Sequence, residues 1–104
     1  MIMKKQFLKS KPVCKVTFSL PKEAAENAKK VQVVGDFNDW NVKKGYSLTK
    51  LKNGSFKKVV NLESGKEYQF RYLIDGENWE NDWNADKYVP TPYGTENSVV
   101  IALN

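Results

Sequence analysis

The apolar residues of this chain recur at every second position in several short segments, and this alternation constrains the fold more than any other feature. Side chains of a β-strand point alternately to the two faces of a sheet, so period two predicts strands with one buried face. The alternation is found in these segments: residues 13–20, 31–34, 55–62, 67–74 and 97–103. Residues 22–30 have a helix-like composition, but the stretch is too short for a stable helix, and we expect a loop or a single turn.

Turn signals separate these segments at regular intervals. They are Gly35-Asp36, Lys44-Gly45, Asn53-Gly54, Ser64-Gly65 and Asp75-Gly76. Asn-Gly and Asp-Gly favour positive φ and therefore tight hairpins. Short strands with turns at this spacing predict an all-β fold, an antiparallel β-sandwich of immunoglobulin-like type. We expect a single sandwich domain over residues 13–104 and a flexible N-terminal arm over residues 1–12.

Length, charge and cysteine content narrow the class of protein. A chain of 104 residues is long enough for one compact core. It has no apolar run of membrane-spanning length and no apolar run behind its basic start, as a secretory signal would have, so we expect a cytoplasmic location by default. The net charge of +5 comes from lysines before residue 59, which favours a solubilising surface. Nucleic-acid binding is the less favoured alternative, and its affinity would fall steeply with salt.

The sequence offers little for catalysis. It contains no histidine, the commonest general base and metal ligand, so we expect no metal and no cofactor. Its lone cysteine, Cys14, lies in a predicted strand and reads as a small core residue rather than a nucleophile. Paired carboxylates could hydrolyse a glycoside, and the candidates are Asp75, Glu77, Glu80, Asp82 and Asp86. Acids in such segments ordinarily serve turns, and a thin sandwich leaves little depth for a cleft, so we expect no catalytic activity.

Three tryptophans lie among polar turn residues rather than in smooth strands. Trp40 is in residues 35–41 (GDFNDWN), and Trp79 and Trp83 are in residues 75–84 (DGENWENDWN). A tryptophan in such a place either covers the core or forms a flat exposed surface. An exposed indole can stack on the apolar face of a glucose ring, while neighbouring amides both donate to and accept from its hydroxyls.

Three motifs resemble those of the family-48 carbohydrate-binding modules. They are residues 35–40 (GDFNDW), 65–76 (GKEYQFRYLIDG) and 93–100 (YGTENSVV), and the resemblance covers roughly residues 15–103. That family includes the glycogen-binding domain of the AMP-activated protein kinase β subunit and the N-terminal modules of glycogen branching and debranching enzymes. The resemblance implies an early-set immunoglobulin-like sandwich that binds α-glucan, glycogen or starch, without catalysis. A glycoside hydrolase or branching-enzyme label would then reflect domain association.

The resemblance also implies a set of sugar-binding residues. Glycogen-binding members of the family stack two tryptophans on glucose and bond its hydroxyls through a basic residue. An apolar residue, a threonine and an asparagine before the last strand complete their site. The matching positions are Trp40, Trp79, Arg71, Tyr93, Thr95 and Asn97. Asn38, within the first motif, is expected to tie its own turn together rather than to touch sugar.

The chain departs from the family pattern in three places. The turn before Trp79 is one residue longer than in the kinase subunit, which leaves the direction of that ring open. Trp83 stands where relatives often have proline, and it is either an added platform or a lid on the core. Tyr93 replaces an aliphatic residue. An alternative function therefore stays open, a protein-interaction module that positions a glucan-active enzyme or kinase without binding sugar.

Overall fold

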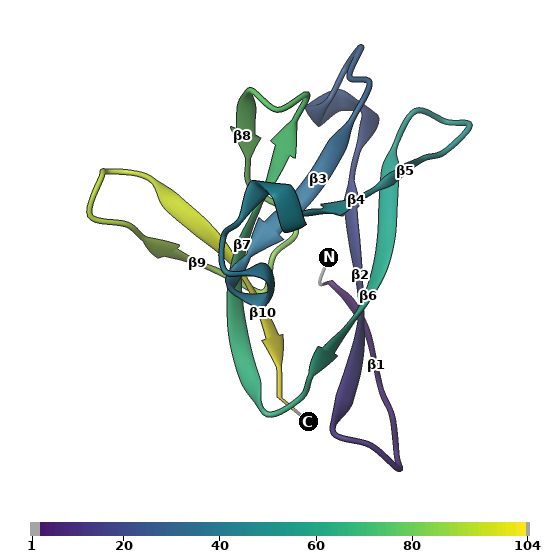
Figure 1. The fold of residues 1–104 in the computed structure, drawn as a ribbon, viewed down its shortest axis with the longest axis vertical. Coiled ribbons are helices and arrows are strands. Elements are labelled where there is room, and N and C mark those ends of the chain that lie inside the picture. Colours follow the sequence, from purple (N-terminus) through teal and green to yellow (C-terminus); the bar gives the residue numbers. More distant parts are fainter. Residues whose placement is uncertain (1–2, 104) are drawn as a thin grey trace.

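Two antiparallel sheets pack together in the computed structural model, which describes residues 3–103 (Figure 1). The first sheet has the strand order β1 (Lys4–Phe7), β2 (Val13–Leu20), β6 (Phe56–Glu63), β5 (Thr49–Lys50). The second has the order β4 (Tyr46–Ser47), β3 (Val31–Gly35), β7 (Lys66–Ile74), β10 (Glu96–Ala102), β9 (Lys87–Pro90), and β8 (Asn78–Glu80) pairs with β7. The predicted all-β antiparallel sandwich is confirmed.

The remaining regular elements are short 3₁₀ turns: η1 (Lys22–Ala24), η2 (Asp36–Asn38) and η3 (Val42–Lys44). Residues 22–30, where we expected a loop or a single turn, contain only η1. None of the helical turns within residues 3–103 has the length or apolar character needed to cross a membrane.

The core forms where the alternating faces of the two sheets meet. Strand β2 buries Cys14, Val16, Phe18 and Leu20, and β7 buries Tyr68, Phe70 and Tyr72. The Phe18 and Phe70 rings meet edge to face across the core, with centroids 5.0 Å apart and planes at 75°. Such a pair adds about 0.5–1.5 kcal/mol beyond its buried area. Period-two alternation therefore produces the buried face that the sequence predicts.

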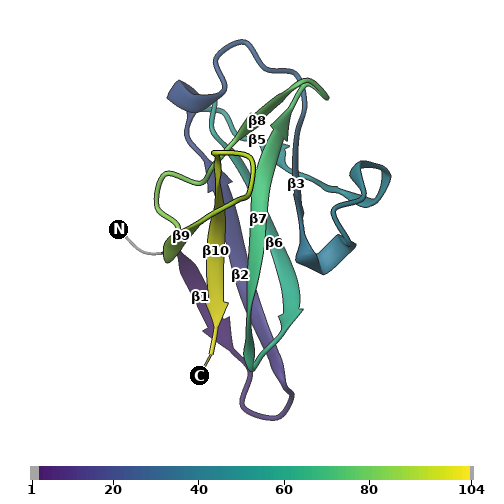
Figure 2. The same ribbon diagram turned by 90° about the vertical axis from the view of Figure 1, so that its left-hand side faces the viewer.

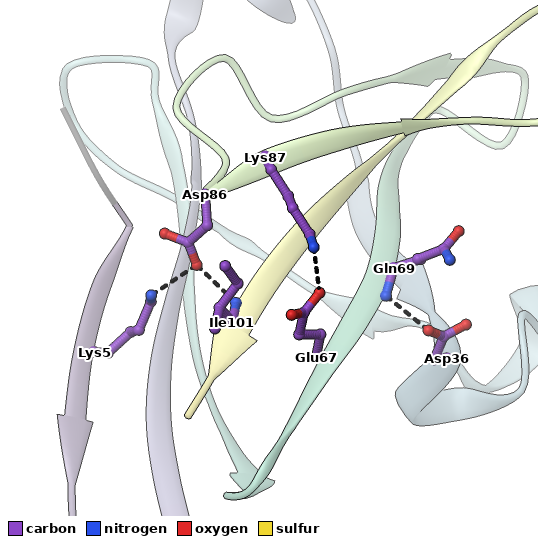
Figure 3. A network of polar contacts seen from close by, with 7 residues as sticks. All are labelled: Lys5, Asp36, Glu67, Gln69, Asp86, Lys87 and Ile101. Atoms are coloured by element: carbon purple, nitrogen blue, oxygen red, sulfur yellow. Dashed lines mark hydrogen bonds and ion pairs between the residues drawn. The ribbon is translucent and has the colours of Figure 1, made fainter. Parts of the chain in front are cut away.

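The first strand corrects our expectation for the N-terminus. Residues 4–7, within the segment predicted to be a flexible arm, form β1 and pair antiparallel with β2. Lys5 Nζ lies 2.7 Å from Asp86 Oδ2, and that oxygen also accepts the backbone N–H of Ile101 at 2.7 Å (Figure 3). Because Ile101 belongs to β10, this contact fastens the edge of the first sheet to the second. Met3, just before β1, is buried.

The outer face of the second sheet carries polar side chains near one end. Since Phe70 and Tyr72 face the core, the alternate residues Gln69 and Arg71 of β7 face outward. The β9–β10 hairpin projects away from the two sheets at the left of Figure 1, and Figure 2 looks onto that side of the molecule. The η2 turn, which follows β3, also lies against β7. The η2 turn and the β9–β10 hairpin, which are distant in sequence, thus lie around the outward face of β7.

Candidate functional site

An open groove of about 670 Å³ lies on this outer face, within the size range of ligand sites. Its lining residues come from the η2 loop, β7, β8 and the β9–β10 hairpin: Trp40, Gln69, Arg71, Trp79, Pro90, Thr91, Pro92, Tyr93, Thr95 and Asn97. All six residues nominated by sequence therefore lie in one place. Their binding of sugar stays a prediction.

The loop after β3 holds Trp40 in an unusual backbone conformation. Both Asp39 and Trp40 have φ of 56°, a left-handed region that bulky residues rarely occupy. The Trp40 backbone N–H donates to the Gly35 carbonyl at 2.9 Å, and its indole Nε1 donates to Asp36 Oδ1 at 2.9 Å. Backbone outliers of this kind cluster at functional sites. The loop stabilises one orientation of the indole beside β7.

Two residues of the same loop explain why the chain turns there. Asn38 is buried, and its side chain accepts the Gly35 N–H at 2.9 Å and donates to the carbonyls of Val33 and Lys44, both at 3.3 Å. Asn38 therefore ties the turn together, as expected from the sequence. At Gly35 a Cβ would lie 2.3 Å from the Gln69 carbonyl oxygen, so only glycine lets β3 approach β7 this closely.

Trp79 provides a second aromatic surface next to Trp40. It lies on β8, opposite Leu73 of β7, and is 44% exposed. The two indole centroids are 6.5 Å apart and their planes make an angle of 54°. The rings therefore form two adjoining surfaces at an angle rather than one flat stack.

Arg71 lies between the aromatic residues and the hairpin. Its Nε donates to Asn97 Oδ1 at 2.7 Å, and its Nη2 donates to Thr95 Oγ1 at 2.8 Å. Thr95 Oγ1 in turn lies 2.7 Å from Thr91 Oγ1. Paired bonds of this kind fix a guanidinium plane in a way that a lysine ammonium does not. The orientation of Arg71 is thus set before any ligand arrives.

Tyr93 occupies the tip of the hairpin and is 89% exposed. The tip is closed by the Thr91 N–H, which donates to the Thr95 carbonyl at 2.8 Å, and by Gly94 with φ of 79°. Because glycine adopts positive φ without strain, the turn leaves the tyrosine ring projecting at one end of the groove.

A comparison with known protein families matches residues 6–104 to the carbohydrate-binding family described as the glycogen recognition site of AMP-activated protein kinase. The chain belongs to this family. The resemblance to family-48 carbohydrate-binding modules of the kinase β type is thereby confirmed. A search of curated proteins found no match.

The five carboxylates considered for catalysis lie outside the groove. Asp82 is buried and accepts the Tyr72 hydroxyl at 2.6 Å, and burial raises the pKa of both groups. Asp75 accepts the backbone N–H groups of Lys29 and Lys30, which lower its pKa. None of the five candidate acids is among the residues that line the groove. Over residues 3–103 there is also no cluster of three or more acidic or cysteine side chains suited to a metal ion.

Trp83 lies apart from the groove. It is 52% exposed, so it is not a lid on the core. It is not among the lining residues, so it is not an added platform of this groove either. The preceding residue explains this position. Asp82 turns inward to Tyr72, and its backbone N–H donates to Ser98 Oγ at 2.8 Å. The next side chain, that of Trp83, remains at the surface.

Four lining residues were not nominated from the sequence: Gln69, Pro90, Thr91 and Pro92. Gln69 carried a usable signal, because it lies two positions before Arg71 on the same face of a predicted strand. The other three belong to the hairpin, whose first strand is too short to show a periodic pattern.

Proposed function

We propose that this chain binds an α-glucan, a glycogen or starch chain of α-1,4-linked glucose, in the groove and does not cleave it. The pair of angled indoles of Trp40 and Trp79 beside a fixed Arg71, in a member of a glycogen recognition family, carries the proposal. No acidic side chain is present among the groove-lining residues to act on a glycosidic bond.

Stacking supplies the affinity in this mechanism. The apolar face of a glucose ring covers an indole and buries area at little cost in side-chain entropy, because tryptophan has few rotatable bonds. An α-1,4 chain curves, so successive glucose units present their faces at an angle. The 54° between Trp40 and Trp79 suits two such units better than parallel rings would.

The polar residues supply the orientation. The guanidinium of Arg71 and the side chains of Thr95 and Asn97 bond sugar hydroxyls, and Tyr93 contacts the glucan at the outer end of the groove. Arg71, Thr95 and Asn97 are already held by one another, so binding orders few of the polar side chains. An open groove still encloses only part of a sugar, and we expect affinity on the order of micromolar or weaker.

Retention on glycogen or amylose tests this function. The wild type is expected to be retained, whereas Trp40→Ala and Trp79→Ala each lose binding by about thirtyfold, the effect of a hot-spot tryptophan worth roughly 2 kcal/mol. Trp83→Ala is the matched control, because it removes an exposed tryptophan outside the groove. If the wild type and Trp40→Ala fail equally to bind, the proposal is wrong.

The exposed Trp83 favours a second candidate function, the positioning of a glucan-active enzyme or kinase. A large apolar ring outside the groove is a suitable contact for a protein partner. Capture of such an enzyme from a glucan-free extract, lost in Trp83→Ala and kept in Trp40→Ala, would support this role. Capture lost in Trp40→Ala alone would contradict it.

A further inference from the structure

The floor of the groove contains a hydrogen-bond chain whose direction is set by Arg71. A guanidinium can only donate, so Asn97 must turn its Oδ1 toward Arg71 Nε, 2.7 Å away. The Asn97 amide nitrogen then faces the other way and donates to Gln69 Oε1 at 3.0 Å. The orientation of two amides, usually ambiguous, thus follows from the chemistry of one neighbour.

This direction leaves donors facing the groove. The Gln69 oxygen is engaged by Asn97, so the Gln69 amide nitrogen is the free end of an exposed, groove-lining side chain. Within residues 3–103, no hydrogen bond is found for Gln69 Nε2 or for Arg71 Nη1, and Arg71 has no ion pair. The floor between the tryptophans and the hairpin therefore offers N–H groups to a ligand.

The backbone of Gln69 is linked to the same site. Its N–H donates to Asp36 Oδ2 at 2.7 Å (Figure 3). The other oxygen of that carboxylate accepts the indole N–H of Trp40. One carboxylate thus fixes Gln69 relative to the aromatic surface on which a sugar would stack.

We propose that Gln69 is a specificity-determining residue of the groove, with its amide turned by Arg71 and Asn97 so that Nε2 donates to a sugar oxygen. This inference rests on the proposed glucan binding. The floor then selects a ligand by its acceptors: the bound glucose hydroxyls accept from Gln69 and Arg71 and direct their own hydrogens elsewhere.

The test is Gln69→Glu, which keeps an oxygen for Asn97 Nδ2 but replaces the free donor with an acceptor of the same size. At pH 7, calorimetric titration with maltoheptaose should show about tenfold weaker binding than in the wild type, because two acceptors then face each other. As the pH falls toward about 4.3, the usual glutamic acid pKa, the carboxyl gains a proton to donate and affinity should recover. Wild-type affinity should change little.

Two controls separate binding from folding. Glu67→Gln makes the reverse change two residues earlier on the same face, outside the groove, where Glu67 pairs with Lys87 at 2.8 Å (Figure 3). It should bind as the wild type at each pH. Gln69→Ala removes the donor without adding charge and should bind more weakly, with no pH-dependent recovery. Circular dichroism at each pH checks that every variant is folded.

The outcomes distinguish the two proposals. If the wild type binds glucan and Gln69→Glu binds it equally well at pH 7, the role proposed for Gln69 is wrong and the glucan site stands. A weaker Gln69→Glu variant that does not recover on acidification also overturns it, since donation would not be the cause. Absence of wild-type binding overturns both.

Discussion

The Asp36 carboxylate holds the indole of Trp40 with one oxygen and the β7 backbone with the other. Trp40 Nε1 donates to Oδ1 at 2.9 Å, and the Gln69 N–H donates to Oδ2 at 2.7 Å. The conformation of the η2 loop and the position of the ring are therefore coupled to the strand that carries Arg71. Asp36 does not line the groove, and we regard it as a positioning residue.

Replacing Asp36 should loosen the ring without removing it. Asp36→Ala is expected to weaken glucan binding by about tenfold and to cost roughly 1–3 kcal/mol of unfolding free energy, because the Gln69 N–H and the indole lose an ionised acceptor. Calorimetric titration and urea unfolding measure the two effects. Trp40 fluorescence anisotropy, read in a Trp79→Phe, Trp83→Phe background, should fall as the ring gains freedom.

Asp39→Asn is the matched control for this prediction. It removes a carboxylate from the same loop, and asparagine tolerates the positive φ found there. It should leave affinity and anisotropy unchanged. Equal affinity of Asp36→Ala and the wild type would contradict a positioning role.

Arg71→Lys should keep the positive charge and lose the geometry. A lysine ammonium cannot reproduce the planar pair of bonds to Asn97 and Thr95, so the amide chain loses the neighbour that directs it. We expect about tenfold weaker binding of maltoheptaose with little change in thermal stability. Binding as tight as that of the wild type would show that charge alone is sufficient.

The lowered pKa of Asp75 predicts a contribution to folding stability that is lost in acid. The backbone N–H groups of Lys30 and Lys29 hold its pKa below the usual 3.8, so the folded state favours the ionised form. This stability is present above pH 3.8 and is lost as the pH falls through the lowered pKa. The melting temperature of Asp75→Asn should therefore be below that of the wild type at pH 7, and the gap should close in acid.

Asp75→Ala separates the charge from the turn. Asp75 has φ of 52°, which asparagine accepts more easily than alanine. The alanine variant should melt below the asparagine variant at every pH. A gap between the wild type and Asp75→Asn that does not change with pH would contradict the ionic contribution.

Lys5→Ala should detach β1 from the second sheet. The variant leaves the carboxylate of Asp86, whose side chain is 8% exposed, without its cation. We expect a loss of about 1–3 kcal/mol in urea unfolding. Amide exchange in β1 should accelerate more than in β7. Lys4→Ala, at an exposed neighbouring position, is the control, and equal losses in both variants would assign the effect to strand propensity instead.

Local pattern was enough to predict the long strands but not the short ones. The long strands β2, β6 and β7 each show a buried and an exposed face within their own sequence, as Tyr68, Phe70 and Tyr72 of β7 do. The five residues of β3 are all buried, and a mostly apolar run rather than alternation marks that strand. β1 and β9 are four residues long and β4 only two, so their pairing depends on neighbours brought close by folding. The Lys5–Asp86 contact has no local signature for the same reason.

The candidate site divides in a similar way. Trp40, Arg71 and Trp79 could be nominated because family motifs mark them, and the structure brings them to one groove. Gln69 could have been nominated by its place on the same strand face as Arg71, but its hydrogen bond with Asn97 has no local signature. Asp36 carried no such signal, because its role depends on Gln69, which lies far away in the sequence. The angle between the two indoles is likewise a property of the assembled sheet and not of any motif.

Because Cys14 is completely buried, its reaction with a thiol reagent reports the opening of the first sheet. This residue is the single thiol of the chain, it lies on β2 between its partners on β1 and β6, and burial raises its pKa. A thiol reagent can reach it only when a strand of the first sheet separates, so the labelling rate measures that fluctuation directly. Labelling rates measured with and without glucan then show whether a ligand on the second sheet changes the opening of the first, and no engineered probe is needed.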